Sequence, residues 1–293
     1  RSVHAVDVDG DGDMDVLSAS GYDDKIAWYR NNGSQSFTEH VISTSANGAY
    51  SVYAADVDSD GDMDVLSASP NDDKIAWYEQ GGPYTYVPDD NFEQALIDLG
   101  YDDILDDSVS TTNISVVTSL DVSQKEISDL TGIEGFTALQ TLKCNDNALT
   151  ALNVSTNTAL TILWCYNNQL TALDVSNNTL LEHFSTQNNN ITSLDVSANT
   201  ALTSLSCSDN QLTSLDVSNN TGLTYLNCGY NELTSLDVSA NTALMELRCG
   251  RNALTSLDVS TNTSLTSLWC DNNQLTTLDV SNNTLLEHFG TQN

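Results

Sequence analysis

The chain has 293 residues, of which 8 are Lys or Arg and 41 are Asp or Glu, giving a formal net charge of −33 at pH 7. This charge repels nucleic-acid phosphates and anionic lipid, so we expect neither as a partner. The 39% of hydrophobic residues suffice for a real core. No apolar run approaches the roughly 18 residues of a membrane span, so we expect no membrane insertion in this chain. The acidity favours a salty or calcium-rich exterior.

Residues 1–80 contain a repeat with a period of 49 residues. The segment 2–20, SVHAVDVDGDGDMDVLSAS, returns at 51–69, and the segment DDKIAWY of 23–29 returns at 72–78. Short apolar runs alternate with polar residues and are separated by Gly, Asn and Asp turns, a pattern that predicts about four strands per unit. Four strands in 40–50 residues match the size of a propeller blade.

Each unit carries an acidic loop of nine residues, which starts at Asp7 in the first copy and at Asp56 in the second. Carboxylates at loop positions 1, 3, 5 and 9 can converge on one hard cation, with a backbone carbonyl at position 7. Glycine at position 6 permits the sharp turn. Five carboxylates in nine residues would repel one another without a cation. The alternative is an acidic, solvated turn, but two copies with glycine in register favour calcium.

The acidic loop between strands, followed by IAWY, resembles the FG-GAP/VCBS repeat of integrin-type β-propellers. That resemblance implies two calcium sites, in which the seventh loop residue contributes its carbonyl. The implied ligands are Asp7, Asp9, Asp11, Asp13 and Asp15 in the first site, and Asp56, Asp58, Asp60, Asp62 and Asp64 in the second. One unit and part of another cannot close a ring. We therefore expect further blades upstream, the alternative being a calcium-stiffened β-module that leads into the rest of the chain.

Residues 81–138 form a predicted linker and cap. A Gly-Gly-Pro run ends the blade pattern, and a helix is expected over about 89–99, with an acidic cap before it and Gly100 after it. An atypical unit is expected at the end of a repeat array because the first repeat would otherwise expose its core. The segment 116–123, VVTSLDVS, matches a half-repeat of the region that follows.

Residues 139–293 repeat one phrase with a period of 21, and their plainest copy is the segment 223–241, LTYLNCGYNELTSLDVSAN. A fixed period in the twenties predicts a solenoid, in which each repeat buries its apolar side by stacking on a neighbour. The cysteines follow this period, with Thr186 in the one missing slot. They are Cys144, Cys165, Cys207, Cys228, Cys249 and Cys270. We expect buried free thiols, because each takes the place of a small hydrophobe and no CxxC pair or nearby His offers a zinc site.

Each turn has two halves, LxxLxCxxNxL and LxxLDVSxNTxL, with the same apolar spacing. This pattern resembles the 21-residue, cysteine-containing leucine-rich repeats of large bacterial surface proteins. Because both halves carry the spacing, we expect strands on two sides of a narrow coil and no helix along its back. The predicted fold is mainly β: partial β-propeller blades, then a leucine-rich repeat solenoid with one N-terminal capping helix.

The outward columns of the two halves differ in how much they vary. In the LxxLDVS half, Asp and Ser recur at almost every turn, and bound cations or high salt would relieve repulsion along the Asp column. In the LxxLxC half the columns change at every turn and include aromatic residues and arginine, which are enriched in recognition surfaces. We therefore predict a recognition face there, the alternative being drift on a tolerant surface. Its residues are Trp164, Tyr166, His183, Tyr225, Arg248 and Trp269.

No nucleophile motif, nucleotide loop or partnered histidine indicates catalysis, and we expect a protein that is not an enzyme. The favoured function is an extracellular or cell-surface binding or adhesion protein. It would be secreted or bound to a bacterial surface, use calcium, and bind an extracellular protein or glycan. One alternative is a set of accessory modules of a larger secreted hydrolase. The other is a structural spacer or ice-binding solenoid, suggested by a threonine at every turn.

Overall fold

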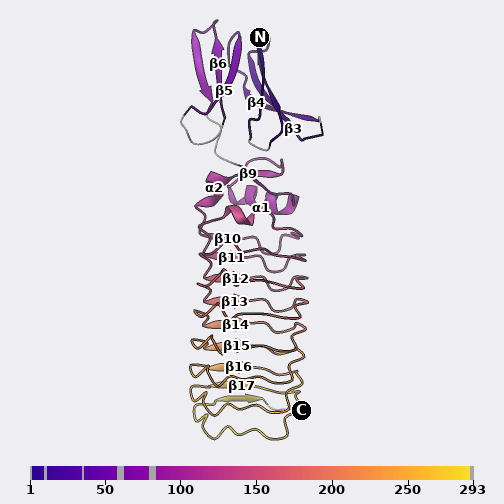
Figure 1. Cartoon of the computed structure of the whole chain (residues 1–293), viewed down its shortest axis with the longest axis vertical. Coiled ribbons are helices and arrows are strands. Elements are labelled where there is room, and N and C mark those ends of the chain that lie inside the picture. The colour runs from indigo at the N-terminus through magenta and orange to yellow at the C-terminus, as the bar shows by residue number, and fades with distance from the viewer. Residues whose placement is uncertain (1, 10–11, 35, 58–62, 79–83, 291–293) are drawn as a thin grey trace. The chain divides into compact units, whose positions relative to one another are not determined.

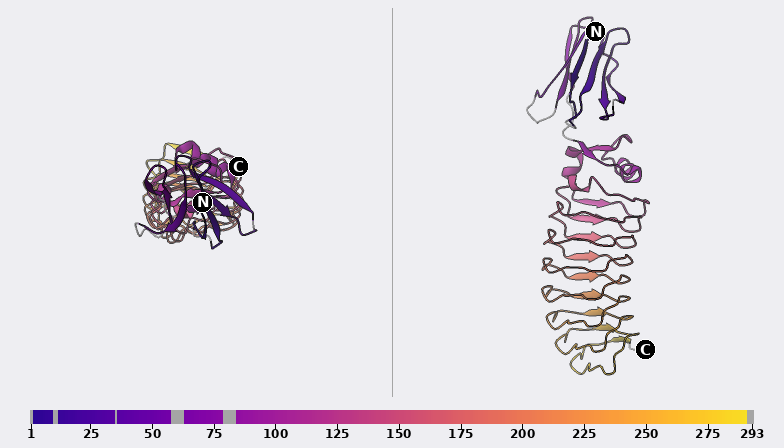
Figure 2. Two further views of the ribbon diagram at one scale, coloured as in Figure 1. Left: turned by 90° about the horizontal axis from the view of Figure 1, so that it is seen from above. Right: turned by 45° about the vertical axis from the view of Figure 1, so that its right-hand side comes forward.

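The computed structural model describes residues 2–9, 12–34, 36–57, 63–78 and 84–290. The chain divides into two compact units (Figure 1). One unit comprises Arg1–Tyr84 with Ser110–Thr112, and the other comprises Thr85–Val109 with Asn113–Asn293. The first is built from small antiparallel sheets and the second is a solenoid of stacked coils (Figure 2).

The first unit contains two sheets whose strands repeat in the same register. Val3 lies opposite Ser18 in one sheet, and Val52 lies opposite Ser67 in the other. The strands of the four-stranded sheet, in spatial order, are β1 (Ser2–Val6), β2 (Asp15–Ser20), β3 (Lys25–Asn31) and β4 (Phe37–Ser43). Those of the three-stranded sheet are β5 (Ser51–Ala55), β6 (Asp64–Ser69) and β7 (Lys74–Tyr78). The alternating apolar runs thus form the strands that the sequence predicts.

The solenoid begins with a cap. Strands β8 (Tyr84–Tyr86) and β9 (Ser108–Ser110) pair, and helix α1 (Asp90–Leu99) follows β8 in the chain. The Asp89 carboxylate accepts hydrogen bonds from the backbone N–H groups of residues 91 and 92, and Gly100 ends the helix with a φ of 80°, a conformation that glycine adopts without strain. The predicted capping helix is therefore confirmed.

Two further short helices escaped the sequence patterns. They are α2 (Thr111–Ser115) and the 3₁₀ helix η1 (Ile133–Gly135). The residues of α2, TTNIS, have low intrinsic helix propensity, and the helix is held by tertiary packing, since Ile114 is completely buried in the core of the solenoid.

Along the solenoid, one short strand per coil forms a parallel sheet of nine strands (Figure 1). In spatial order the strands are β10 (Ser119–Asp121), β11 (Thr141–Lys143), β12 (Ile162–Trp164), β13 (His183–Ser185), β14 (Ser204–Ser206), β15 (Tyr225–Asn227), β16 (Glu246–Arg248), β17 (Ser267–Trp269) and β18 (His288–Gly290). All but the first come from the LxxLxC half of the repeat.

The expectation of strands on two sides is wrong, because among the described residues of the repeats the LxxLDVS half forms turns. In the coil that precedes β15, the Asp216 carboxylate accepts a hydrogen bond from the backbone N–H of Ser218 at 2.9 Å. The backbone N–H of Asn220 then bonds the Val217 carbonyl at 3.0 Å. Such Asx turns offer the backbone a local partner in place of a ladder to the next coil.

The same turns explain the uniform Asp and Ser columns. Hydrogen bonds from Ser218, through its hydroxyl and then its backbone N–H, lower the pKa of Asp216. The repeated Asp is thus a turn residue whose charge has local hydrogen-bond donors. This gives the column a structural role that does not require bound cations.

The sequence of the segment 116–123 matches the LxxLDVS half of the repeat, but in the structure the segment takes the place of the LxxLxC half. Leu120 lies opposite Leu142 in the pairing of β10 with β11, so this stretch forms the first strand of the sheet. The first coil is therefore one residue longer than the rest, because the paired Leu120 and Leu142 are 22 residues apart, whereas the repeat has a period of 21.

Two ladders of buried asparagines link successive coils. The Asn189 side chain donates to the carbonyls of Cys165 and Thr186 at 3.1 Å each, and accepts from the Leu170 N–H at 3.0 Å. On the other half, the Asn220 amide donates to the carbonyls of Val196 at 3.0 Å and Asn199 at 2.8 Å. These side chains satisfy the buried backbone groups that the strand ladder leaves unpaired.

The cysteines line the inside of the coils as free, buried thiols. Burial raises the pKa of Cys165 and of Cys207 to about 12. They pack with the repeated leucines and valines in one continuous core, as their positions in the repeat predict.

Candidate functional sites

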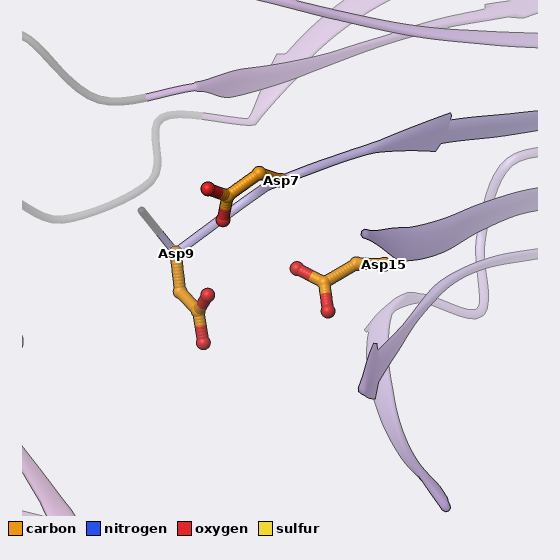
Figure 3. Close-up of side chains that lie close together, drawn as sticks. All are labelled: Asp7, Asp9 and Asp15. Carbon is orange, nitrogen blue, oxygen red and sulfur yellow. The ribbon is translucent and has the colours of Figure 1, made fainter. Parts of the chain in front are cut away.

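The first acidic loop brings three carboxylates together between β1 and β2 (Figure 3). Asp7, Asp9 and Asp15 each place one oxygen so that the three atoms lie within 4.8 Å of one another. Asp13 lies in the described part of the same loop, and Asp11 lies outside the described residues. Three converging carboxylate oxygens are the donor set of a hard cation such as calcium.

Backbone groups hold these carboxylates in place. The fully buried Asp15 accepts from the N–H of Val8 at 2.9 Å and from the N–H of Asn31 at 2.7 Å. Gly12 N–H donates to Asp7 Oδ2 at 3.0 Å, and Gly12 has a φ of 93°, which few residues other than glycine adopt. Backbone N–H groups of the described part of the loop and of β3 thus hold Asp7 and Asp15.

Two features of the site bear on whether it can bind a cation. Asp7 Oδ1 is buried and has no hydrogen-bond partner among the described residues, an oxygen that a cation could bind. Arg30 Nε lies 2.7 Å from Asp9 Oδ2 and places a positive charge beside the cluster. A group of carboxylate oxygens, one of which has no hydrogen-bond partner among the described residues, fits a calcium ion. The Arg30 guanidinium would compete with that ion for the Asp9 carboxylate.

The second loop is described only at its ends. Asp64 is fully buried and accepts from the Val57 N–H at 2.9 Å, as Asp15 accepts from Val8 in the first loop. Asp56 lies at the other end of the loop, whereas Asp58, Asp60 and Asp62 lie outside the described residues.

On the solenoid, the predicted recognition residues lie on the outer face of the parallel sheet and line two neighbouring hollows. The first hollow, of about 350 Å³, spans strands β12 to β15. It is lined by Trp164, Tyr166, His183 and Tyr225, together with hydroxyl and amide side chains. Burial raises the pKa of Tyr225, so its hydroxyl stays protonated and can donate a hydrogen bond.

The second hollow, of about 300 Å³, is lined by Arg248 and Trp269 and by two residues that the sequence patterns did not indicate, Tyr230 and Arg251. Arg251 stacks over the Tyr230 ring, its Cζ 4.8 Å from the ring centroid. Arg248 donates from Nε to Glu246 Oε1 at 2.5 Å.

Tyr230 and Arg251 occupy an unusual backbone position. In the described part of 139–293 the equivalent residue of each repeat has a positive φ, and apart from these two it is Asp or Asn; in the first coil it is Gln124, with a φ of 58°. The column consists of Asp146, Asn167, Asn188, Asp209, Tyr230, Arg251 and Asn272, with φ between 51° and 57°. Asn and Asp adopt this left-handed conformation more readily than bulky residues do. The break in the column was visible in the sequence, but the reason that it matters, the positive φ, was not.

Comparisons with known proteins found matches to both parts of the chain. Residues 7–67 match the FG-GAP-like repeat family, and residues 200–241 match the family of leucine-rich repeats in two copies. Internalin J of Listeria monocytogenes is 43% identical over 73 residues, which is 25% of this chain and 8% of that protein. The solved functional domain of InlJ from the same organism, which includes a cysteine ladder, is 41% identical with a TM-score of 0.68.

The chain joins an FG-GAP-like segment to an internalin-like leucine-rich repeat solenoid. The match to the InlJ domain covers 72% of this chain and 48% of that one, so the chain spans about half the length of that solved relative. Internalin C2 of the same species, at 22% identity and a TM-score of 0.58, covers 70% of this chain and 95% of its own, and shows the fold alone. Among the described residues, none of the helices combines the length and the hydropathy that crossing a bilayer requires.

Proposed function

We propose that this chain is an extracellular or bacterial cell-surface binding protein, without catalytic activity, whose solenoid binds a protein partner through the outer face of its parallel sheet. The observation that carries the proposal is the pair of hollows on that face, lined by Trp164, Tyr225, Trp269 and two arginines. Tryptophan, tyrosine and arginine side chains are enriched at binding hot spots. The similarity to Internalin J, a leucine-rich repeat protein, supports an adhesion-type role.

The contrast between the two sides of the coil supports the choice of face. Asp216 and its equivalents form local turns, which explains why that side is uniform. The strand side carries a different set of side chains at each coil, as in the column Tyr225, Glu246, Ser267. Short strands hold these side chains on a rigid frame, which favours a preorganised interface.

The experiment compares variants on the two sides of the stretch of coils from β12 to β15. Biotinylated chain is offered to intact host and bacterial cells, bound protein is counted by flow cytometry, and a glycan array is probed in parallel. We expect Trp164→Ser with Tyr225→Ser to abolish cell binding, and Thr192→Ala with Thr213→Ala on the turn side to leave it unchanged. Equal binding by both pairs would refute this choice of face. Binding to protease-treated cells, or to the array alone, would indicate a glycan in place of a protein.

We also propose that the first unit binds calcium through the loop of Asp7, Asp9 and Asp15, with Asp11 and the Asp13 carbonyl completing the site. A second site is proposed in the loop of Asp56 and Asp64. The buried, unpartnered Asp7 Oδ1 supports this assignment. Bound calcium would supply the charge that keeps the acidic loop folded between its two strands.

Isothermal titration of the chelator-treated chain with CaCl₂ tests this proposal, with MgCl₂ as a control for nonspecific charge. We expect Asp7→Asn with Asp9→Asn to remove the first site and to leave the second, whereas Asp23→Asn, outside the loop, should change neither. Heat evolved equally by magnesium, or unchanged calcium binding in the double variant, would contradict the proposed ligands.

A further inference from the structure

The two sheets of the first unit repeat the same sequence, yet their repeated side chains differ in exposure. Ile26 and Trp28 on β3 are 0% and 8% exposed, whereas their counterparts on β7, Ile75 and Trp77, are 85% and 47% exposed. The contrast is reversed for the other face: Val52 on β5 is 4% exposed and its counterpart Val3 on β1 is 73% exposed. One face of each sheet is therefore covered and the opposite face is open.

The two covered faces pack on each other, together with Ala46 and Ala49 of the segment between β4 and β5. Ile26 and Trp28 belong to one buried cluster with Val52, Ala54 and Val65 of the second sheet. At the border of this contact, the rings of His4 and Tyr53 lie 4.9 Å apart. The β2–β3 face of one sheet thus packs on the β5–β6 face of the next.

The two open faces carry the same two patterns. We define the tail face as Leu66, Ala68, Ile75 and Trp77, which repeat the covered face of the first sheet. We define the head face as Val3, Ala5, Val16 and Ser18, which repeat the covering face of the second sheet. The head face of one molecule therefore repeats the four side chains with which the second sheet covers the first within the chain.

We propose that the tail face binds another unit of the same kind, which for this chain is the head face of a second copy. Such a contact is heterologous, because two different surfaces meet, and it leaves one head and one tail free to continue. Isoleucine and tryptophan at 85% and 47% exposure give the tail face the apolar character of a surface that becomes buried on association. The internal contact of the two sheets supplies both the geometry and the partner chemistry.

Analytical ultracentrifugation of the 293-residue chain, at rising concentration, tests this proposal with the chain itself as the probe. The wild type should associate beyond the dimer. Val3→Glu blocks the head and Ile75→Glu blocks the tail, so each variant alone should sediment as a monomer. An equimolar mixture of the two should form a dimer and nothing larger, because one intact head then meets one intact tail.

Val116→Glu is the matched control, since Val116 is 72% exposed and lies in the other unit; it should associate like the wild type. All three replaced side chains are at the surface, so far-UV circular dichroism should show unchanged folding. A wild type that stays monomeric would overturn the proposal. So would self-association of the Val3→Glu variant alone, which would indicate a symmetric contact between two tail faces.

Discussion

Replacing Tyr230 and Arg251 by asparagine should stabilise the solenoid and impair its binding. Both residues have a positive φ, 53° and 56°, at the position where the neighbouring repeats have Asn or Asp. A non-glycine residue in the left-handed region costs about 1–2 kcal/mol, and asparagine reduces this because its short side chain can bond locally. Asparagine could also extend the existing ladder, in which Asn188 donates to Asn167 Oδ1 at 2.8 Å.

The contact that the replacement removes is weaker than this strain. Arg251 stacks over Tyr230 at 4.8 Å, and an exposed cation–π contact contributes about 0.5–1 kcal/mol. The Tyr230→Asn and Arg251→Asn double variant relieves two strained residues and loses one contact. We therefore expect a net stabilisation of about 1–2 kcal/mol, which for a domain of this size raises the melting temperature by about 2–8 °C.

Thermal unfolding followed by far-UV circular dichroism measures the gain, and the cell-binding assay measures the loss of affinity. The matched control is the reverse change, Asn188→Tyr, which should lower the melting temperature because it adds the strain without an arginine above the ring. A double variant that melts below the wild type would mean that the lost cation–π contact outweighs the relieved backbone strain, contrary to this prediction. If binding is unchanged, the second hollow is not part of the recognition face.

Four further outcomes follow from other parts of the structure. Asn220→Ala removes two buried hydrogen bonds and should lower the free energy of unfolding by about 2 kcal/mol. Its control, Asn219→Ala, removes one exposed hydrogen bond and should change that free energy by less than about 0.5 kcal/mol. Urea unfolding of the two variants measures the difference. Because burial raises the pKa of Cys165 to about 12, a disulfide reagent at pH 8 should titrate the thiols only after denaturation. Burial, chiefly, raises the pKa of Asp102 from 3.8 to about 6, so this group binds more proton in the folded state between those two values and lowers stability as pH rises through them. Asp102→Asn should reduce this slope, to which the raised pKa of Glu93 also contributes, and should melt higher at pH 7. Arg30→Gln removes the cation beside Asp9 and should tighten calcium binding in the titration, while an unchanged affinity would exclude competition.

Much of the solenoid follows from its period. A spacing of 21 residues places Leu, Val and Cys on the inside of every coil, and the buried thiols and the N-terminal capping helix agree with that expectation. The apolar spacing could not tell which half forms the sheet, because both halves carry it. In the repeats the chain turns at Asp216 and Ser218 and their equivalents, which share a local hydrogen bond. Asp121 accepts the same bond from Ser123 at the end of strand β10, so this motif alone does not decide which half forms the sheet.

The candidate sites were predictable to the extent that they are local in sequence. The acidic loop that brings Asp7, Asp9 and Asp15 together is a single run of nine residues, so its convergence follows from spacing. Arg30 comes from β3 and reaches the loop only because β2 and β3 pair. The second copy has Glu79 at the equivalent position, so the repeat gave no sign of this contact.

Because the chain repeats itself, the residue at each position can be compared with its equivalents in the other repeats. A position that differs from its equivalents in residue type or exposure is a candidate for a function beyond packing. At the turn column, two adjacent repeats replace Asn or Asp by Tyr230 and Arg251 at a positive φ, against the local preference of the backbone. Strain that is retained at one place, when the relaxed alternative occurs in the neighbouring coils, is expected where a side chain serves a ligand.

In the first unit the repeated residues are kept but their environment changes, since Ile75 is exposed where Ile26 is buried. A repeated apolar pattern on an open face is expected where a partner covers it. The two kinds of departure therefore point to different partners: a ligand on the sheet of the solenoid, and another unit of the same kind on the tail face.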